Sequence, residues 1–186
     1  MALRPLQPFS PEPHLQEIAL ACDAAVDERG ILRLQYRLSG PLQSLALPPA
    51  TPEPGRRDGL WENTCFEAFF GQAGQPNYWE INLGPSGDWN LYALSDYRTS
   101  LRQEERLSRL PFQQVREPVA SCDPTSLQHL DLELVLDLRE LLALDGPLEL
   151  SATAVLDHRS FGCSYWAWRH TGPEADFHRR DSFLPL

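Results

Sequence analysis

The sequence predicts an all-β fold, an antiparallel two-sheet β-sandwich that is jelly-roll-like and has few short helices. Three observations predict it. Apolar residues recur mainly with a period of two, which is typical of strands that bury one face. The 186 residues include 17 prolines, nearly twice the usual share of about 5 per cent, and most lie between apolar runs. Strand and helix patterns do not alternate, as they would in a parallel sheet with crossover helices.

The strand pattern is clearest in residues 32–38, where leucines and Tyr36 alternate with two arginines and a glutamine. Such alternation indicates a strand with one buried and one solvated face. Short apolar runs separated by glycine-rich turns indicate successive antiparallel hairpins. Together these patterns predict strands at 32–38, 64–70, 78–83, 89–94, 130–138 and 148–156, with 165–169 and 183–186 closing the sheet edges.

Helical signal is weak and confined to two segments. Residues 100–110 are charged and end before a proline, and residues 138–144 precede an Asp-Gly-Pro turn, so we expect one short helix in each. Two proline-rich segments, 1–13 and 40–59, are expected to be irregular, the second as a long surface loop.

The size of the chain favours one domain spanning residues 1–186. A 21.1 kDa fold buries roughly 70 per cent of the surface that its unfolded chain exposes, so one sizeable core is feasible. The sequence contains neither an internal repeat nor a domain linker.

Charge and composition exclude several classes of chemistry. The chain has 26 acidic and 16 basic residues, all 16 of them arginine, for a formal charge of −10. Without lysine there is no Walker-type phosphate loop and no Schiff-base or pyridoxal-phosphate lysine. The acidic balance predicts no nucleic-acid partner and no membrane partner, since both depend on a positive surface. We expect no cofactor and no metal.

The cysteines indicate the compartment. Cys22, Cys65, Cys122 and Cys163 are scattered without a CxxC pair or a secreted-framework spacing, which is typical of reduced thiols in a cytoplasm. Residues 1–13 carry prolines instead of the apolar stretch of a signal peptide, and no run approaches 18 apolar residues. These features predict a soluble cytoplasmic protein.

The aromatic residues are concentrated in two segments, 61–98 and 161–186, which hold fifteen of the 5 Trp, 5 Tyr and 8 Phe. The first segment also contains five acids and a single base, Arg98. If the apolar residues of strands 64–70 and 78–83 share the core face, the hairpin register places Glu67 opposite Asn82, with Glu80 on the diagonal. The same alternation puts Asn90 and Tyr92 of the next strand on that face.

A face of this composition suits a sugar-like ligand. Carboxylates and amides hydrogen-bond vicinal hydroxyls, while aromatic rings stack on the C–H faces of a pyranose. The alternative is an ordinary solvated sheet face, on which these carboxylates have no binding role. Arg98 is expected to pair with Glu67, Glu80 or Asp96, or else to orient a ligand.

Several blocks of the sequence resemble a known family. The strings GLWENTCFEAFF (59–70), YWEINLGPSGDWNLY (78–92) and YR (97–98), with SYWA (164–167), DFH (176–178) and DSF (181–183), are similar to the bacterial DOMON-like family. That family is related to the type 9 carbohydrate-binding modules. The resemblance covers about residues 30–186 and implies a single β-sandwich domain whose relatives bind sugars or haem and are not generally catalysts.

The resemblance also implies roles for particular residues. In sugar-binding type 9 modules, tryptophans sandwich the ligand and a glutamate hydrogen-bonds it, and Trp61 and Glu67 match those positions. The second sandwiching residue is expected to be Trp166 or Trp168. The 85–89 block lies outside the sugar motif, so the sugar specificity of those modules does not transfer directly. The expected ligand-binding residues are Trp61, Glu67, Glu80, Asn82, Tyr92, Arg98, Trp166 and Trp168.

The leading hypothesis is therefore a non-catalytic module that binds a carbohydrate or a sugar-containing metabolite. One alternative is a structural or protein-interaction sandwich whose aromatics mainly build the core. A second is haem binding, which needs a His/His pair because Met1 is the only methionine. A third is a glycoside-processing enzyme that uses Glu67 and Glu80 as its carboxylate pair. His170 and His178 are expected to satisfy backbone groups near the sheet edge, beside salt bridges of Asp176 and Asp181.

Overall fold

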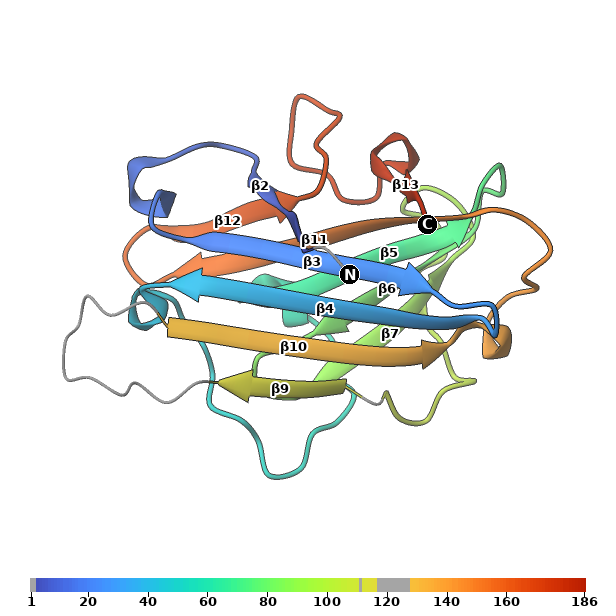
Figure 1. Ribbon diagram of the computed structural model, residues 1–186, viewed down its shortest axis with the longest axis horizontal. Coiled ribbons are helices and arrows are strands. Elements are labelled where there is room, and N and C mark those ends of the chain that lie inside the picture. Colours follow the sequence, from blue (N-terminus) through green and yellow to red (C-terminus); the bar gives the residue numbers. More distant parts are fainter. Residues whose placement is uncertain (1–2, 111, 117–127) are drawn as a thin grey trace.

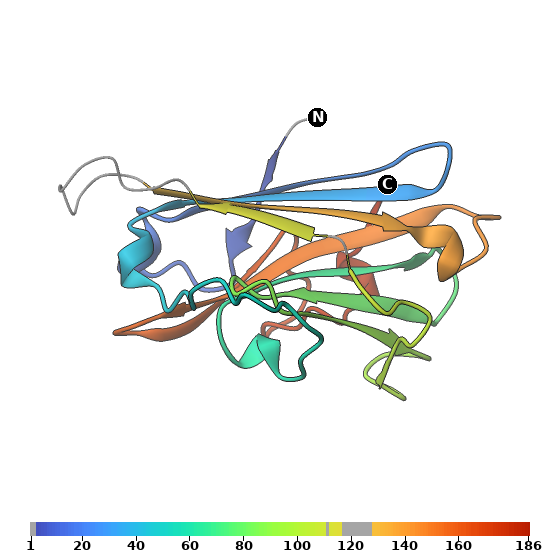
Figure 2. The same cartoon turned by 90° about the horizontal axis from the view of Figure 1, so that it is seen from below.

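A computed structural model describes residues 3–110, 112–116 and 128–186 of the chain. Cys122 lies outside the described residues. In this part of the chain the fold is two antiparallel β-sheets packed face to face, which confirms the predicted sandwich (Figures 1 and 2). Among the described residues, no helix has the length and apolar character needed to cross a membrane.

The smaller sheet has five strands in the order β1-β3-β4-β10-β9, every neighbouring pair antiparallel (Figure 1). Its long strands are β3, β4 and β10, and β4 pairs with β10 along its whole length from Ile31 to Gly40. The strands are β1 (Arg4–Pro5), β3 (Ala19–Val26), β4 (Ile31–Gly40), β9 (Phe112–Arg116) and β10 (Gln128–Asp137).

The larger sheet has eight strands in the order β2-β12-β11-β5-β6-β7-β8, with β13 pairing to β11. Its central strands β11, β5, β6 and β7 form an antiparallel platform. The strands are β2 (Gln7–Pro8), β5 (Cys65–Gln72), β6 (Tyr78–Leu83), β7 (Trp89–Leu94), β8 (Arg102–Gln103), β11 (Leu148–His158), β12 (Gly162–Ala167) and β13 (Leu184–Pro185).

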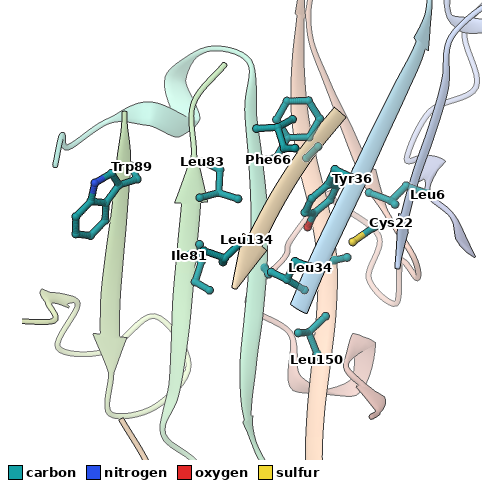
Figure 3. Close-up of a cluster of buried hydrophobic side chains, with 14 of the residues drawn as sticks. Leu6, Cys22, Leu34, Tyr36, Phe66, Ile81, Leu83, Trp89, Leu134 and Leu150 are labelled. Carbon is teal, nitrogen blue, oxygen red and sulfur yellow. The ribbon is translucent and has the colours of Figure 1, made fainter. Parts of the chain in front are cut away.

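The main core fills the space between the two sheets. Leu34 and Tyr36 of β4 point into it from one side, and Phe66 and Ile81 from the other (Figure 3). Burying alternate side chains of every long strand supplies the hydrophobic stabilisation that holds the layers together, about 25 cal/mol for each Å² of apolar surface removed from water. The Tyr36 hydroxyl also donates a hydrogen bond across the layers to the carbonyl oxygen of Glu67.

The outer faces of the two sheets differ. On β4 the outward residues Arg33, Gln35 and Arg37 are exposed, so the pattern of the strand alternates as the sequence predicts. On β6 and β7 every residue is buried, which means that both faces of these strands are covered. The larger sheet therefore carries a second layer on its outer face.

Helical structure is limited to five short 3₁₀ turns in the described residues: η1 (Pro13–Leu15), η2 (Leu42–Ser44), η3 (Leu60–Glu62), η4 (Leu138–Glu140) and η5 (Arg180–Ser182). The helix expected at 138–144 is shortened to η4. The helix expected at 100–110 is wrong, because β8 and turns occupy this segment. Leu107 and Leu110 are buried in the main core, and Glu104 is buried beneath Arg106, so long-range contacts override the local helical pattern.

The strand predictions at 32–38, 64–70, 78–83, 89–94, 130–138 and 148–156 are confirmed within one or two residues at most ends. The sequence pattern missed β3 and β9, and it missed β1 and β2 within the segment 1–13. β3 is rich in alanine and carries Asp23, so its apolar alternation is weak.

Candidate functional site

The candidate site is built on the outer face of the larger sheet, where polar side chains from β5, β6 and β7 meet. The register pairs Glu67 with Asn82 and Asn82 with Asn90, and it pairs Glu80 with Tyr92. The predicted opposition of Glu67 and Asn82 is therefore confirmed. Because the neighbouring residues of each strand face the main core, this row of polar residues necessarily lies on the other side.

This polar row is covered instead of solvated. Glu67 and Glu80 are 2% and 4% exposed, and Asn82 and Asn90 are fully buried. Carboxylates are almost never this buried without partners. Other segments of the chain therefore cover this face of the sheet. Three of them lie over the face: residues 55–63 with η3, residues 95–103, and residues 168–183 after β12. Figure 2 shows η3 on the side of the larger sheet that faces away from the smaller sheet.

The first covering segment is held by Arg56 and Asp58. The Arg56 guanidinium donates to Asn90 Oδ1 at 2.8 Å and to the carbonyl of Glu104 at 2.9 Å, and it stacks 4.3 Å from the Trp89 ring. Asp58 Oδ1 accepts from the Tyr92 hydroxyl at 2.6 Å. These contacts fix the segment that carries the next residues of the chain, η3, against β7.

The last covering segment is held by Arg180. Its guanidinium pairs with Glu149 of β11 and donates to the carbonyl of Gln72 at 2.9 Å. It also lies 4.8 Å from the Phe183 ring, and Phe183 is buried in a small second core with Phe69. The C-terminal residues therefore pack on the outer face of the sheet and close one side of the site.

A cavity of about 300 Å³ remains between these segments. Glu67 and Glu80 line it from the sheet, and His178 and Arg98 line it from the covering segments. Its aromatic lining comes from Trp61, Tyr165 and Phe177, with Trp61 39% and Tyr165 43% exposed. The volume lies at the lower end of the usual range for small-molecule sites, about 300 to 1,000 Å³.

Glu80 presents one satisfied and one unsatisfied oxygen. Asn82 Nδ2 donates to its Oε1 at 2.8 Å, whereas its buried Oε2 has no hydrogen-bond partner among the described residues. Burial raises the pKa of this carboxyl, although the Asn82 hydrogen bond and the charge of Arg98 oppose the rise.

Glu67 is contacted by two side chains, those of Tyr36 and Thr153. Its carbonyl accepts from Tyr36 in the opposite sheet and from the Thr153 hydroxyl at 3.4 Å, and its carboxylate lies 3.5 Å from the same hydroxyl. Burial raises the pKa of Glu67 well above its ordinary range, and the nearby charge of Glu80 raises it further. The two carboxyls thus disfavour each other's ionised form.

His178 completes the polar lining. Its Nδ1 is hydrogen-bonded to the Tyr78 hydroxyl at 2.8 Å, and its Nε2 lies 3.9 Å from Glu80 Oε2. Burial and the charge of Arg98 lower the pKa of His178 to about 4, against the opposing charge of Asp176. The ring is therefore neutral near pH 7, and it contacts Phe69 edge-on at 5.1 Å between centroids.

Arg98 pairs with Asp176, so the expected pairing with Glu67, Glu80 or Asp96 is wrong. Its Nη2 donates to Asp176 Oδ1 at 2.9 Å, while Tyr97 donates to Oδ2 of the same carboxylate at 2.6 Å. Asp176 is brought there by the covering segment after β12, a long-range approach that the strand pattern does not encode. The pairing holds the 95–101 turn against the C-terminal segment.

The structure gathers Trp61, Glu67, Glu80 and Arg98 around one cavity, as expected of site residues. Asn82 lies beneath it, where it positions Glu80, and Tyr92 lies behind Trp61, whose ring it meets edge-on at 5.7 Å between centroids. These two residues support the lining instead of forming it.

Neither Trp166 nor Trp168 lies at the cavity, and this corrects the expected second aromatic wall. Trp166 pairs with Ala154, faces the main core and is 3% exposed. Trp168 packs at the edge of that core, and its indole donates to the carbonyl of Arg4 at 3.3 Å. Since side chains alternate along β12, the residue before Trp166 faces the site, and Tyr165 with Phe177 supplies the second wall.

The lining residues that were not predicted as binding residues include Tyr165, Phe177 and His178. The alternation of β11 carried a usable signal for Tyr165, because Val155, its partner, falls between the core residues Ala154 and Leu156. For His178 no signal was available, because it lies in an irregular segment. His170 has a backbone contact as expected, with Nε2 2.9 Å from the carbonyl oxygen of Gln7. In the described part of the chain no cluster of three or more His, Cys, Asp or Glu residues is arranged to hold a metal.

A larger hollow of about 790 Å³ adjoins the site and shares Tyr165 and Ala175 with it. Its lining is mainly apolar, and the carboxylates at it, Glu12 and Glu174, are exposed. Buried polar groups converge on the smaller cavity, which is therefore the candidate site.

No protein-family model matches the chain, and no curated protein matches its sequence. Solved structures that are similar to the chain include the following two. One is a "putative carbohydrate-binding protein" from Bacteroides uniformis ATCC 8492, with 13% identity, a TM-score of 0.67, and a match covering 100% of this chain and 85% of that one. The other is a family 9 carbohydrate-binding module from Caldicellulosiruptor kristjanssonii in complex with cellotriose, with 10% identity, a TM-score of 0.43 and coverages of 90% and 72%. The similarity to the first establishes a shared fold.

Proposed function

We propose that this chain is a non-catalytic carbohydrate-binding module whose ligand occupies the 300 Å³ cavity on the larger sheet. The observation that carries the proposal is the union, in one cavity, of partly exposed aromatic rings with two buried carboxyls. Rings stack on the C–H faces of a pyranose, and carboxylate oxygens accept hydrogen bonds from its hydroxyls.

In this proposal Trp61 forms one wall, and Tyr165 with Phe177 forms the other. Glu80 accepts from ligand hydroxyls through its free Oε2, and Asn82 keeps that carboxylate in position. A pre-formed lining costs little ordering entropy when the ligand binds. The fold shared with the Bacteroides protein, which is described as carbohydrate-binding, and the DOMON-like sequence blocks at 59–70 and 78–92 support the same proposal.

The proposal places the module in the cytoplasm, which is supported by the free thiols of Cys22, Cys65 and Cys163. It includes no nucleic-acid partner, because a chain with a formal charge of −10 repels phosphate backbones.

The test is a glycan panel measured by calorimetry and ligand-observed NMR. We expect binding of at least one sugar by the wild type and at least about a tenfold loss in Trp61→Ala, because a stacking ring contributes more than 1.4 kcal/mol when its area and contact are lost. Trp168→Ala is the matched control, since it removes an indole that lies away from the cavity. Equal binding by Trp61→Ala and the wild type would defeat the proposal, as would an empty panel.

A further inference from the structure

The cavity is lined by a buried carboxyl oxygen that no group of the described chain hydrogen-bonds. Glu80 Oε2 is buried and has no hydrogen-bond partner among the described residues. His178 Nε2 lies 3.9 Å from this oxygen, and the His178 ring is neutral near pH 7. A buried carboxylate oxygen left without a donor carries a desolvation cost that a bound ligand can remove.

The carboxyl of Glu67 lies at the same cavity and is also buried without a strong hydrogen-bond donor. The carboxylate of Glu67 has the Thr153 hydroxyl at 3.5 Å as its long and weak partner. In the described residues seven arginine–carboxylate salt bridges occur, and none of them involves Glu67 or Glu80. The cavity therefore concentrates hydrogen-bond acceptors, and a cation bound there would favour the ionised forms of two carboxyls whose pKa is raised.

Arg98 is not hydrogen-bonded to either glutamate. Its guanidinium lies at the cavity but donates to Asp176 at 2.9 Å, and its side chain is 54% exposed. The charge of Arg98 favours the ionised form of Glu80, but its guanidinium hydrogen-bonds Asp176, which leaves both glutamates without a hydrogen-bonded cation. The other ionisable groups around them are Cys65 and Tyr78 from the sheet and Tyr92 behind Trp61, none of which is a cation.

We propose that this cavity selects sugars that carry a protonated amine, so that its ligand class is amino sugars. The inference rests on the proposed function and narrows it. A ligand ammonium has several N–H donors and a positive charge, so it can donate to Glu80 Oε2 and face Glu67 at once. The aromatic rings of Trp61, Tyr165 and Phe177 add a favourable surface for a cation, since their faces are electron-rich.

A neutral sugar satisfies the same cavity less well. A hydroxyl can donate one hydrogen bond to Glu80 Oε2, but it leaves the charge of the carboxylates uncompensated. An N-acetylated amine has lost its charge and has one N–H, and its acetyl group needs additional volume in a cavity of about 300 Å³. The expected order of affinity is therefore amino sugar, then parent sugar, then N-acetylated sugar.

The experiment compares D-glucosamine and D-galactosamine with their parent sugars and their N-acetylated derivatives, by calorimetry at a pH just below neutrality. We expect at least one amino sugar to bind the wild type at least about tenfold more tightly than its parent. Glu80→Gln should abolish this preference while retaining binding of the neutral sugar, because the amide keeps the shape and the acceptor facing Asn82. Glu133→Gln on the exposed face of β10 is the matched control and should keep the preference.

The outcomes separate the two proposals. If neutral and amino sugars bind equally and Trp61→Ala loses both, the carbohydrate-binding proposal stands and amine selectivity is overturned. If Glu80→Gln keeps the full preference, the assigned recognition group is wrong. If no sugar of this panel or of the wider glycan panel binds, the proposed function fails and amine selectivity fails with it.

Discussion

The two sheets have similar inner faces and very different outer faces. On the smaller sheet the outward residues of β4, Arg33, Gln35 and Arg37, are exposed, and the face ends in water. On the larger sheet the outward residues of β6 include Glu80 and Asn82, both buried under irregular segments. The outer face of the smaller sheet is solvated, whereas the outer face of the larger sheet lies beneath a covering layer.

The covering layer is what gives the larger sheet an enclosed site that the smaller sheet lacks. A solvated sheet face offers a ligand neither enclosure nor desolvation. Covering it with segments anchored by Arg56 and Arg180 lowers the local dielectric around the carboxyls and strengthens every polar contact that a ligand can make there. The same burial is costly without a ligand, as the unpaired Glu80 oxygen shows.

The largest expected effect comes from the apolar part of the covered face. Phe69 is 1% exposed on the outer side of β5 and packs against Phe177, His178 and Phe183. Phe69→Ala should lower the free energy of unfolding by about 3 to 5 kcal/mol through lost burial and a cavity. Gln35→Ala on the open face should change it by less than about 0.5 kcal/mol. Urea denaturation measures both, and comparable losses would erase the contrast between the faces.

The next largest effect is expected at Arg56, which anchors the covering segment 55–63. Arg56→Met removes the donors to Asn90 and to the carbonyl of Glu104, so we expect a loss of about 2 kcal/mol, within the usual range for hydrogen bonds from a charged group. Arg33→Met on the exposed face is the control. Hydrogen exchange should also show faster exchange in residues 55–63 in Arg56→Met, and unchanged protection there would refute the anchoring role.

The third prediction concerns pH. The folded-state pKa of Glu80 is raised above its unfolded value, so the stability that the protonated carboxyl contributes is full below about pH 4.3 and is lost as pH rises through the folded pKa. Glu80→Gln cannot ionise and should gain stability relative to the wild type as pH rises from about 4.3 through the folded pKa of Glu80. Thermal melts across this range measure the gain. A constant difference, or one that Glu133→Gln reproduces, would contradict burial as its cause.

The smallest effect is expected on the open face. Arg37 and Asp131 form an exposed two-bond ion pair between β4 and β10, with side chains 49% and 29% exposed. Asp131→Asn should cost less than about 1 kcal/mol and less still in high salt. Asp176→Asn on the covered face should cost more, because that carboxylate accepts from Tyr97, Arg98 and the backbone of His178. Equal costs in denaturant titrations would argue against the comparison.

Much of the fold was predictable because strand patterns are local. The alternation in β4 and β10 and the hairpin turns around β6 identify strands without knowledge of their partners. β3, whose alternation is weak, and the two-residue strands β1, β2 and β8 were not predicted. The segment 100–110 was misassigned as helix, because its buried leucines pack in the main core through long-range contacts.

The residues of the candidate site were also predictable only in part. Glu67 and Glu80 could be placed on one face with Asn82 because hairpin register follows from the turns and the apolar pattern. Tyr165 was missed and Trp166 or Trp168 was expected in its place, because a one-residue shift in the assumed facing of β12 exchanges Tyr165 and Trp166. The partner of Arg98 was missed because Asp176 arrives from an irregular segment 78 residues away in the chain.

By itself the sequence determined the β-sandwich class, the main strands and the pairing of the two glutamates with Asn82 on one face, since all of these follow from local periodicity and short turns. Only the tertiary structure decided that this face is covered, that Tyr165 and Phe177 line the same cavity as Trp61, and that one oxygen of Glu80 is buried without a partner. The physical reason is that burial of an outer sheet face depends on where irregular segments dock, and docking is set by long-range contacts of residues such as Arg56 and Arg180.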